Sequence, residues 1–251
     1  NAVHGIVNVI TVAPGVREER GHVQVSAGSF GRAQGVATWA LGTREGAVDN
    51  PQIGFVGVSL MHEDGWRADT SVDQQRVLLG WDTYWGAWNL ESRLVLQNLN
   101  QETAAFVEGV NAYDSSVLAR ANAAPEAFRD QILARARATL SRDFGDVEVR
   151  VTPYGRWIDA DLLLSFFPSR ALETTGQSGG GVQSALYWDL GENVSLILGA
   201  DGDVSEGGLR EVQARATQSN GYTQGLHYDY AVDMRALAAF AQARWRFAED
   251  W

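Results

Sequence analysis

Apolar and polar residues alternate along much of this chain. From 132 to 140 the even positions are small or apolar, whereas the odd positions from Arg135 to Ser141 carry guanidinium or hydroxyl groups. The same alternation returns at 147–152, at 88–97 and at 237–247. A period of two is typical of a strand with one apolar and one polar face. The pattern therefore predicts β-strands with chemically different sides.

The alternating segments number about ten, and the connections between them differ in length. Short turns are expected near Gly86, 143–146 and 191–193, and long loops near 62–73, 104–130, 166–179 and 207–229. Short turns on one rim and long loops on the other are typical of up-and-down outer-membrane barrels. The predicted strands are approximately 21–30, 32–42, 53–64, 74–85, 87–103, 131–144, 147–165, 180–190, 193–206 and 230–247.

Aromatic residues recur beside the short turns, on the apolar side of the strands. Tryptophan and phenylalanine at the ends of outward apolar strands anchor a barrel at the lipid–water interface. The residues predicted to form this interface are Trp39, Trp85, Trp88, Phe144, Trp188, Trp245 and Phe247.

Composition narrows the function classes. The chain has 27 Gly and 9 Trp, no Cys, and a net charge of −11 from 20 basic and 31 acidic residues. All the basic residues are arginine, which excludes lysine-dependent chemistry. The negative charge argues against a nucleic-acid partner. No apolar run approaches the roughly 18–20 residues of a membrane-spanning helix, and this still permits a membrane barrel.

The amino-terminal segment carries a recognisable motif. Residues 1–11 read N-A-V-H-G-I-V-N-V-I-T, followed by a charged linker and by G-H-V-Q-V-S-A-G-S-F-G-R at 21–32. This order resembles TonB-dependent outer-membrane receptors, whose plug domain ends in a strand of the form A-x-x-G-[IV]-[IV]-N-[IV]-[IV]-T before the first barrel strand. The family more often has a small residue in place of His4 and a Lys in place of Val12.

The resemblance implies an all-β fold, an antiparallel up-and-down transmembrane β-barrel. About ten strands of a probable 22-stranded barrel would be present, preceded by the last strand of a plug domain. The implied division is 1–12 for the end of the plug, 13–20 for a linker and 21–251 for the amino-terminal part of the barrel. We expect the rest of the plug and of the barrel in a longer parent protein.

Candidate binding residues lie on the polar face and in the last long loop. Arginine grips carboxylates and catecholates in a bidentate fork, and tyrosines on a loop suit a flat ligand. Two interpretations stay open for the arginines, namely a solvated wall that pairs with acids and the plug, or the route of an anionic cargo. For the loop, capture of a ligand competes with packing of the loop on itself. The candidates are Arg135, Arg137, Arg150, Tyr154, Arg156, Tyr222, His227, Tyr228 and Tyr230.

Other chemistry finds little support in the sequence. Residues 201–206 (D-G-D-V-S-E) open like a calcium loop but lack its sixth-position Gly and its twelfth-position Glu. His227, Asp229 and Ser219 come without a nucleophile elbow, so we expect no catalytic triad. We predict neither a metal site nor a cofactor. Residues 115–129 predict a short surface helix, interrupted by Pro125.

The resulting hypothesis is a transport protein and not an enzyme. The resemblance implies an energy-coupled receptor in the outer membrane of a Gram-negative bacterium, surrounded by outer-membrane lipid. Such a receptor takes up a scarce metal chelate, most often a ferric siderophore, with the inner-membrane TonB complex acting through the plug. The alternative is a complete small barrel that acts as a passive pore or as a structural or adhesive protein.

Overall fold

The protein is described by a computed structural model that covers residues 21–42, 53–163, 170–216 and 223–247. Ten strands and two short helices make up these residues. The strands are β1 (Gly21–Ala27), β2 (Ala33–Leu41), β3 (Ile53–Glu63), β4 (Val72–Trp85), β5 (Trp88–Glu102), β6 (Phe128–Asp143), β7 (Val147–Leu163), β8 (Ala171–Asp189), β9 (Val194–Gln213) and β10 (Gly225–Trp245).

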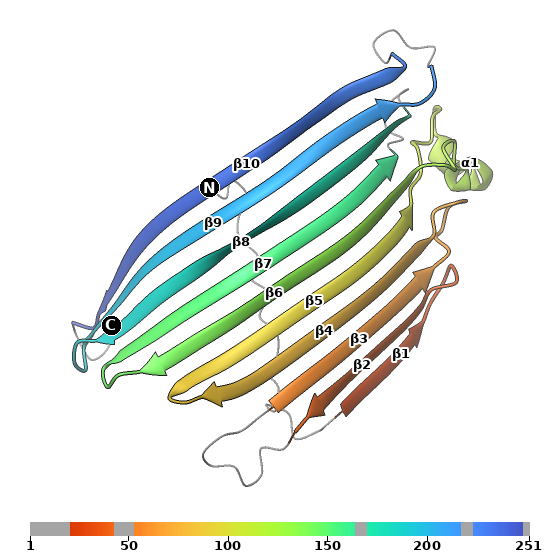
Figure 1. Ribbon diagram of the computed structural model, residues 1–251. Coiled ribbons are helices and arrows are strands. Elements are labelled where there is room, and N and C mark those ends of the chain that lie inside the picture. Colours follow the sequence, from red (N-terminus) through yellow and green to blue (C-terminus); the bar gives the residue numbers. More distant parts are fainter. Residues whose placement is uncertain (1–20, 43–52, 164–169, 217–222, 248–251) are drawn as a thin grey trace.

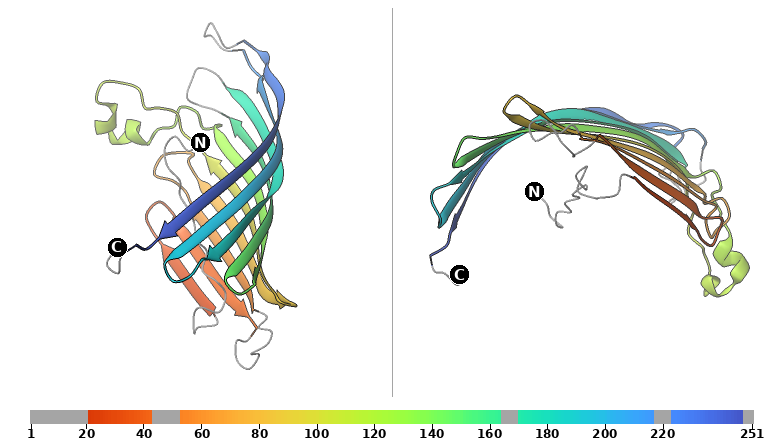
Figure 2. Two further views of the ribbon diagram at one scale, coloured as in Figure 1. Left: turned by 90° about the vertical axis from the view of Figure 1, so that its left-hand side faces the viewer. Right: turned by 90° about the horizontal axis from the view of Figure 1, so that it is seen from below.

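The strands form one antiparallel sheet in which each strand pairs only with its neighbours in sequence (Figure 1). The sheet curves into an open arc with a convex outer face and a concave inner face (Figure 2). The predicted all-β, up-and-down architecture is therefore confirmed. A single curved layer has almost no dry interior, and among the described residues the buried hydrophobic side chains are only Ala112, Ala124, Ala127 and Ala171.

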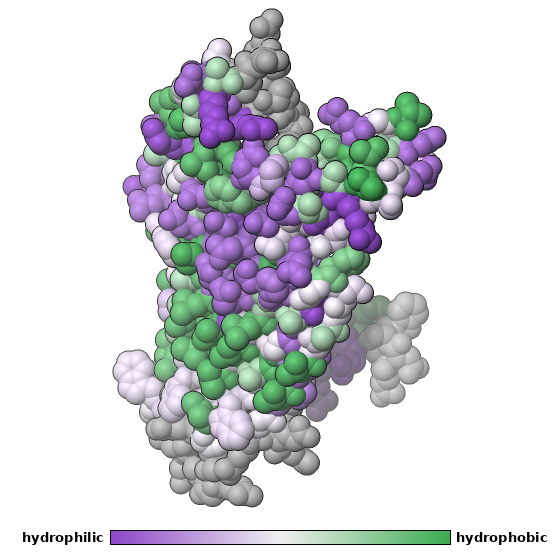
Figure 3. Space-filling model, turned by 90° about the vertical axis from the view of Figure 1, so that its right-hand side faces the viewer, coloured by the Kyte–Doolittle hydropathy of each residue, from purple (hydrophilic) through white to green (hydrophobic). Residues whose placement is uncertain are grey.

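The outer face carries an apolar belt. The strand register brings Leu79, Leu94 and Ala136 into one cross-strand row, and alternate residues along each strand point to the same side. The belt ends abruptly toward the long loops, where Gln75 and Asn98 continue the outer face. Figure 3 shows the belt in green in the lower half of the molecule and a hydrophilic zone in purple above it.

Several strands extend farther toward the long loops than the sequence predicts. Strand β8 begins at residue 171 and not near 180, β9 ends at 213 and not near 206, and β10 begins at 225 and not near 230. In these extensions the outer face is polar too, with Thr174, Ser178 and Arg210 on it. Alternation vanishes when both faces are polar, so the sequence predicts loops at these positions.

The sorting of connections by length is also less strict than expected. The short β1–β2 turn at 28–32 lies on the same rim as the long connections (Figure 1). Its Phe30 and Gly31 adopt positive φ angles of 61° and 68°, which let β1 and β2 reverse within a few residues.

The connection 103–127 between β5 and β6 contains the helical segments η1 (Ala112–Asp114) and α1 (Ser116–Arg120). Ser115 caps α1 by accepting a hydrogen bond from the Leu118 backbone at 3.3 Å. A short helix that ends before Pro125 matches the prediction for this stretch. Neither this helix nor any other in the described part of the chain has the length and apolar character to cross a bilayer.

Candidate functional site: the arginine-lined inner face

The inner face gathers arginines in the middle of the sheet. Register places Arg93 opposite Arg137, and Arg137 opposite Tyr154. The row then continues through Gly181 on β8 to Asp203 on β9. Four of the five residues in this row are polar or charged, so the concave face has a polar centre where the convex face is apolar.

A triad of side chains lies across strand β8. The Arg156 guanidinium holds Asp203 in a fork, with Nη1 2.6 Å from Oδ2 and Nη2 2.8 Å from Oδ1. The Tyr154 hydroxyl donates to the same Oδ2 at 2.5 Å. A bidentate guanidinium–carboxylate pair is strong and fixes the orientation of both groups. The triad therefore forms a rigid point on the inner wall.

Glycine makes the triad possible. Tyr154 on β7 and Asp203 on β9 are separated by Gly181 on the intervening strand. A Cβ at Gly181 would lie 2.7 Å from the Tyr154 hydroxyl oxygen and 2.2 Å from the Gly202 carbonyl oxygen. Only a residue without a side chain leaves the tyrosine room to lie flat and reach Asp203.

A second ion pair, between Arg93 and Asp82, also depends on a glycine beneath the arginine side chain. Arg93 bonds both carboxylate oxygens of Asp82, and Nη2 lies 3.1 Å from Oδ2. Its side chain passes over Gly80, where a Cβ would lie 3.3 Å from the Arg93 Cδ. Only 9% of the Arg93 side chain is exposed, so this guanidinium is committed to Asp82.

Two arginines between these pairs differ from them. Arg135 and Arg137 are exposed on the inner face of β6. Within the described residues neither takes part in a hydrogen bond or an ion pair. Two residues apart on one strand, their Cα atoms are separated by about 7 Å. They therefore offer two unneutralised cations side by side to whatever occupies the concave space.

The remaining candidates lie elsewhere. Arg150, nearer the short turns, bonds Glu148 at 2.7 Å and lies 5.1 Å above the Tyr187 ring. Tyr228 and Tyr230 are about half exposed and lie within strand β10, not in a loop. The structure thus brings Arg135, Arg137, Tyr154 and Arg156 together and leaves Arg150 and the β10 tyrosines apart. Tyr222 lies outside the described residues.

His227 also lies in β10, at a register shift between Leu226 and Tyr228. Its Nδ1 bonds Glu211 at 2.8 Å, and its Nε2 bonds the Thr223 carbonyl oxygen at 2.6 Å. It sits far above the apolar belt, and the bonds to Thr223 and then to Glu211 raise its pKa above the ordinary value. Both ring nitrogens are occupied, so the geometry favours a role in closing the hairpin.

The interface aromatics all lie toward the short-turn rim. Trp85 and Trp88 face each other across the β4–β5 turn, and Trp245 lies 6.0 Å from Phe247. Trp39, Phe144 and Trp188 are 54%, 51% and 40% exposed. Their position at the edge of an exposed apolar belt suits the expected role, which stays a prediction.

The sequence predicts no role for Asp82, and it marks Asp203 only as part of a stretch that opens like a calcium loop. Residues 201–206 lie in the middle of β9 and not at its end, with Asp203 facing inward and Glu206 outward. The two acids thus lie on opposite faces of the sheet. In the described part of the chain no cluster of three potential ligands could hold a metal ion. Asp203 falls within the predicted strand 193–206, but only the cross-strand register shows that it lies across Gly181 from Tyr154.

These features define a class: part of the wall of a large up-and-down barrel, apolar outside and charged inside. Comparison with solved structures agrees. The FpvAI–pyocin S2 complex matches with a TM-score of 0.74 at 12% identity, over 91% of this chain and 35% of that one. The unliganded ferric citrate transporter FecA matches with a TM-score of 0.65 at 11% identity, over 89% and 34%.

The closed form of the ferric-catecholate import receptor Fiu from E. coli K12 also matches, with a TM-score of 0.50 at 10% identity, over 93% of this chain and 49% of that one. The chain thus spans between a third and a half of the chains it matches. No protein-family model and no curated protein matches it. The fold expected from the resemblance to TonB-dependent receptors is confirmed.

Proposed function

We propose that this chain is part of an energy-coupled outer-membrane receptor, and that this receptor imports an anionic iron chelate of the ferric siderophore class. One observation carries the proposal: Arg135 and Arg137, which have no hydrogen-bond or ion-pair partner among the described residues, lie on the concave face of a barrel wall whose convex face is apolar. Structures with this fold include a ferric citrate transporter and a ferric-catecholate import receptor. Carboxylates and catecholates are both anionic groups that arginine binds well.

The remaining parts of the proposal follow from the family resemblance. Residues 1–12 would close a plug domain, 13–20 would link it to the barrel, and the rest of the barrel would belong to the parent protein. The apolar belt would face outer-membrane lipid, and the inner-membrane TonB complex would drive import through the plug. Transport in this scheme requires no catalytic residue and no resident cofactor.

The first experiment identifies the cargo. A strain lacking the parent gene is grown under iron limitation, with one ferric chelate supplied at a time. We expect loss of growth on one anionic chelate and its recovery when the full receptor is restored. An unchanged growth profile on every iron chelate would remove the assignment. Diffusion of unrelated small solutes through the purified protein would instead favour the passive pore.

The second experiment tests the arginines with that chelate. In the full receptor, Arg135→Gln with Arg137→Gln removes two charged donors, each worth roughly 1.5–3 kcal/mol to a bound anion. We expect chelate binding weaker by at least about tenfold. The matched control is Arg210→Gln, since Arg210 lies on the outer face and pairs with Asp229. Equal affinity of the double variant and the control would contradict a role in binding.

A further inference from the structure

One arginine of strand β6, Arg142, lies on the outer face of the sheet and not on the inner face. Arg142 follows Leu140 and Ala138 on the outer side of β6, opposite Val149 of β7. The other outward basic side chains of the described strands, which are His62, Arg210 and Arg235, lie toward the polar upper zone. Arg142 alone lies at the short-turn rim, at the lower edge of the apolar belt.

Two aromatic rings hold this guanidinium. The Arg142 Cζ lies 4.6 Å from the Phe144 ring centroid and 5.9 Å from that of Trp88. The two rings themselves meet edge to face, with centroids 6.3 Å apart. Cation–π contacts position a cation without neutralising its charge. Within the described residues Arg142 has no hydrogen-bond or ion-pair partner, so an outward-facing positive charge is fixed at the rim.

A hollow opens in the belt above it. Its volume is about 670 Å³. On β5, β6 and β7 its lining consists of two outer-face residues flanking one inner residue, which places the hollow on the convex side. The floor is low because Ala136, Ala138 and Gly155 are small, and Trp81 and Leu94 stand higher around it. Such a depression among larger apolar side chains can take a hydrocarbon chain.

The Arg142 charge and the floor of the hollow lie along the same strand, β6, at different depths. Ala138 and Ala136 are four and six residues from Arg142 along β6, which corresponds to roughly 13 and 20 Å of strand. In a strand tilted by roughly 40° these lengths become about 10 and 15 Å of depth. One leaflet contributes about half of a hydrocarbon core of roughly 30 Å. A lipid with its headgroup at Arg142 would therefore extend its chain through the hollow.

We infer that Arg142, Trp88 and Phe144 form a binding site for a phospholipid of the periplasmic leaflet. The phosphate pairs with the Arg142 guanidinium, and one acyl chain lies in the hollow over Ala136 and Ala138. Charge complementarity selects the occupant, because a fixed cation beside an apolar groove matches a phosphate joined to a hydrocarbon chain. The inference rests on the outer-membrane placement in the proposed function, with the short turns on the periplasmic side.

The test uses the complete receptor, purified in detergent and delipidated, then titrated with phosphatidylglycerol while bound lipid is counted by native mass spectrometry. Arg142→Gln removes the charge and Ala138→Leu fills the hollow. We expect each to weaken lipid binding at least fivefold. Controls are Arg210→Gln, a charge outside the site, and Ala37→Leu, which lies on the outer face away from the hollow.

The outcomes separate clearly. Wild-type lipid affinity in Arg142→Gln overturns the inference, as does equal weakening in all four variants, which would indicate nonspecific coating of the belt. Competition by inorganic phosphate alone, with no effect of Ala138→Leu, would mean that no acyl chain is seated and would also overturn it. Chelate uptake by the unsubstituted receptor is measured in parallel. If the phospholipid binds as expected but no chelate is taken up, the result counts against the proposed function and not against the phospholipid site.

Discussion

At the scale of single residues, glycine decides which inner-face side chains can meet. Charged groups on β7 and β9, or on β4 and β5, reach each other by crossing over Gly181 and Gly80. Sequence alternation places these charges on the correct face. It does not indicate that Arg156 pairs with Asp203 while Arg135 finds no ion-pair partner among the described residues, because that depends on the register across three strands.

Substituting Gly181 tests this device. In Gly181→Ala the new Cβ would meet the Gly202 carbonyl oxygen at 2.2 Å and the Tyr154 hydroxyl oxygen at 2.7 Å. We expect a loss of roughly 1–3 kcal/mol, typical of overpacking, visible as a lower thermal transition of the receptor in detergent. In the control Gly202→Ala the nearest atom is the Leu237 Cδ2 at 3.4 Å, so a much smaller change is expected. Equal losses in both variants would argue against the crossing tyrosine.

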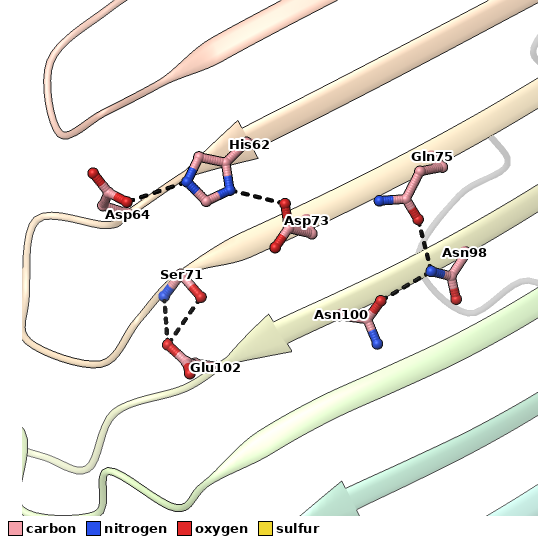
Figure 4. Close-up of polar contacts among 8 residues, drawn as sticks. All are labelled: His62, Asp64, Ser71, Asp73, Gln75, Asn98, Asn100 and Glu102. Atoms are coloured by element: carbon pink, nitrogen blue, oxygen red, sulfur yellow. Dashed lines mark hydrogen bonds and ion pairs between the residues drawn. The ribbon is translucent and has the colours of Figure 1, made fainter.

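At the scale of elements, the number and order of the strands follow from alternation, but the upper ends of β8, β9 and β10 do not. Above the belt, β4 and β5 carry an outer-face amide network in which Asn98 Nδ2 donates to Gln75 at 2.7 Å and to Asn100 at 2.9 Å (Figure 4). Hydrogen-bonded polar residues on both faces extend a strand while erasing its period-two pattern. The sequence predicts the ends of β4 and β5 to within two residues, and it misses the longer polar extensions of β8, β9 and β10.

The β3–β4 hairpin has a pH-sensitive contact in this upper zone. His62 bonds Asp73 at 2.8 Å and Asp64 at 3.1 Å (Figure 4). The bond to Asp73 first, and then that to Asp64, raises the pKa of His62 above its ordinary 6.5. The contribution to stability is therefore complete below about pH 6.5 and is lost as the pH rises through the raised pKa of the folded state.

We therefore expect faster hydrogen exchange at residues 60–75 of the receptor at pH 8.5 than at pH 6, after correction for the intrinsic rate. His62→Gln removes the titrating group and should flatten this difference. A pH dependence that persists in His62→Gln would assign it to other groups.

The side chain of one residue, Asn122, anchors the long connection 103–127 through four hydrogen bonds to backbone groups. The Asn122 amide nitrogen donates to the Asp69 and Thr103 carbonyl oxygens at 3.0 and 3.2 Å. Its side-chain oxygen accepts from Ala124 and Ala105 at 3.0 and 3.4 Å. Asn122→Ala leaves these four backbone groups without that partner, each worth roughly 1 kcal/mol. We expect protease cleavage within 103–127 to quicken while the thermal transition of the barrel stays unchanged. The control is Asn111→Gly, because the Asn111 side chain makes no capping bond and glycine accepts its left-handed backbone at φ 54°.

At the scale of the whole molecule, the belt and the arginine-lined wall are two sides of one sheet. The period-two pattern can be recognised in the sequence because a strand that crosses a hydrocarbon layer must be apolar on the side that faces this layer and can be charged on the other side. What the sequence could not give is the depth of each residue. Depth depends on strand tilt and on cross-strand register, which together decide that the belt ends at Gln75 on one strand and at Glu206 on another.

Cysteine scanning measures this depth directly, since the chain has no cysteine of its own. Single cysteines at 132–140 of the receptor in native membranes are treated with a water-soluble maleimide. We expect labelling at odd positions, which lie on the concave face, and protection at even positions, which lie on the convex face that the proposed function places against lipid. Across 173–178 and 206–210, above the belt, both parities should label, because water reaches both faces there. Equal labelling of even and odd positions at 132–140 would mean that no hydrocarbon covers the convex face, and the receptor and the phospholipid site would then both lose their physical basis.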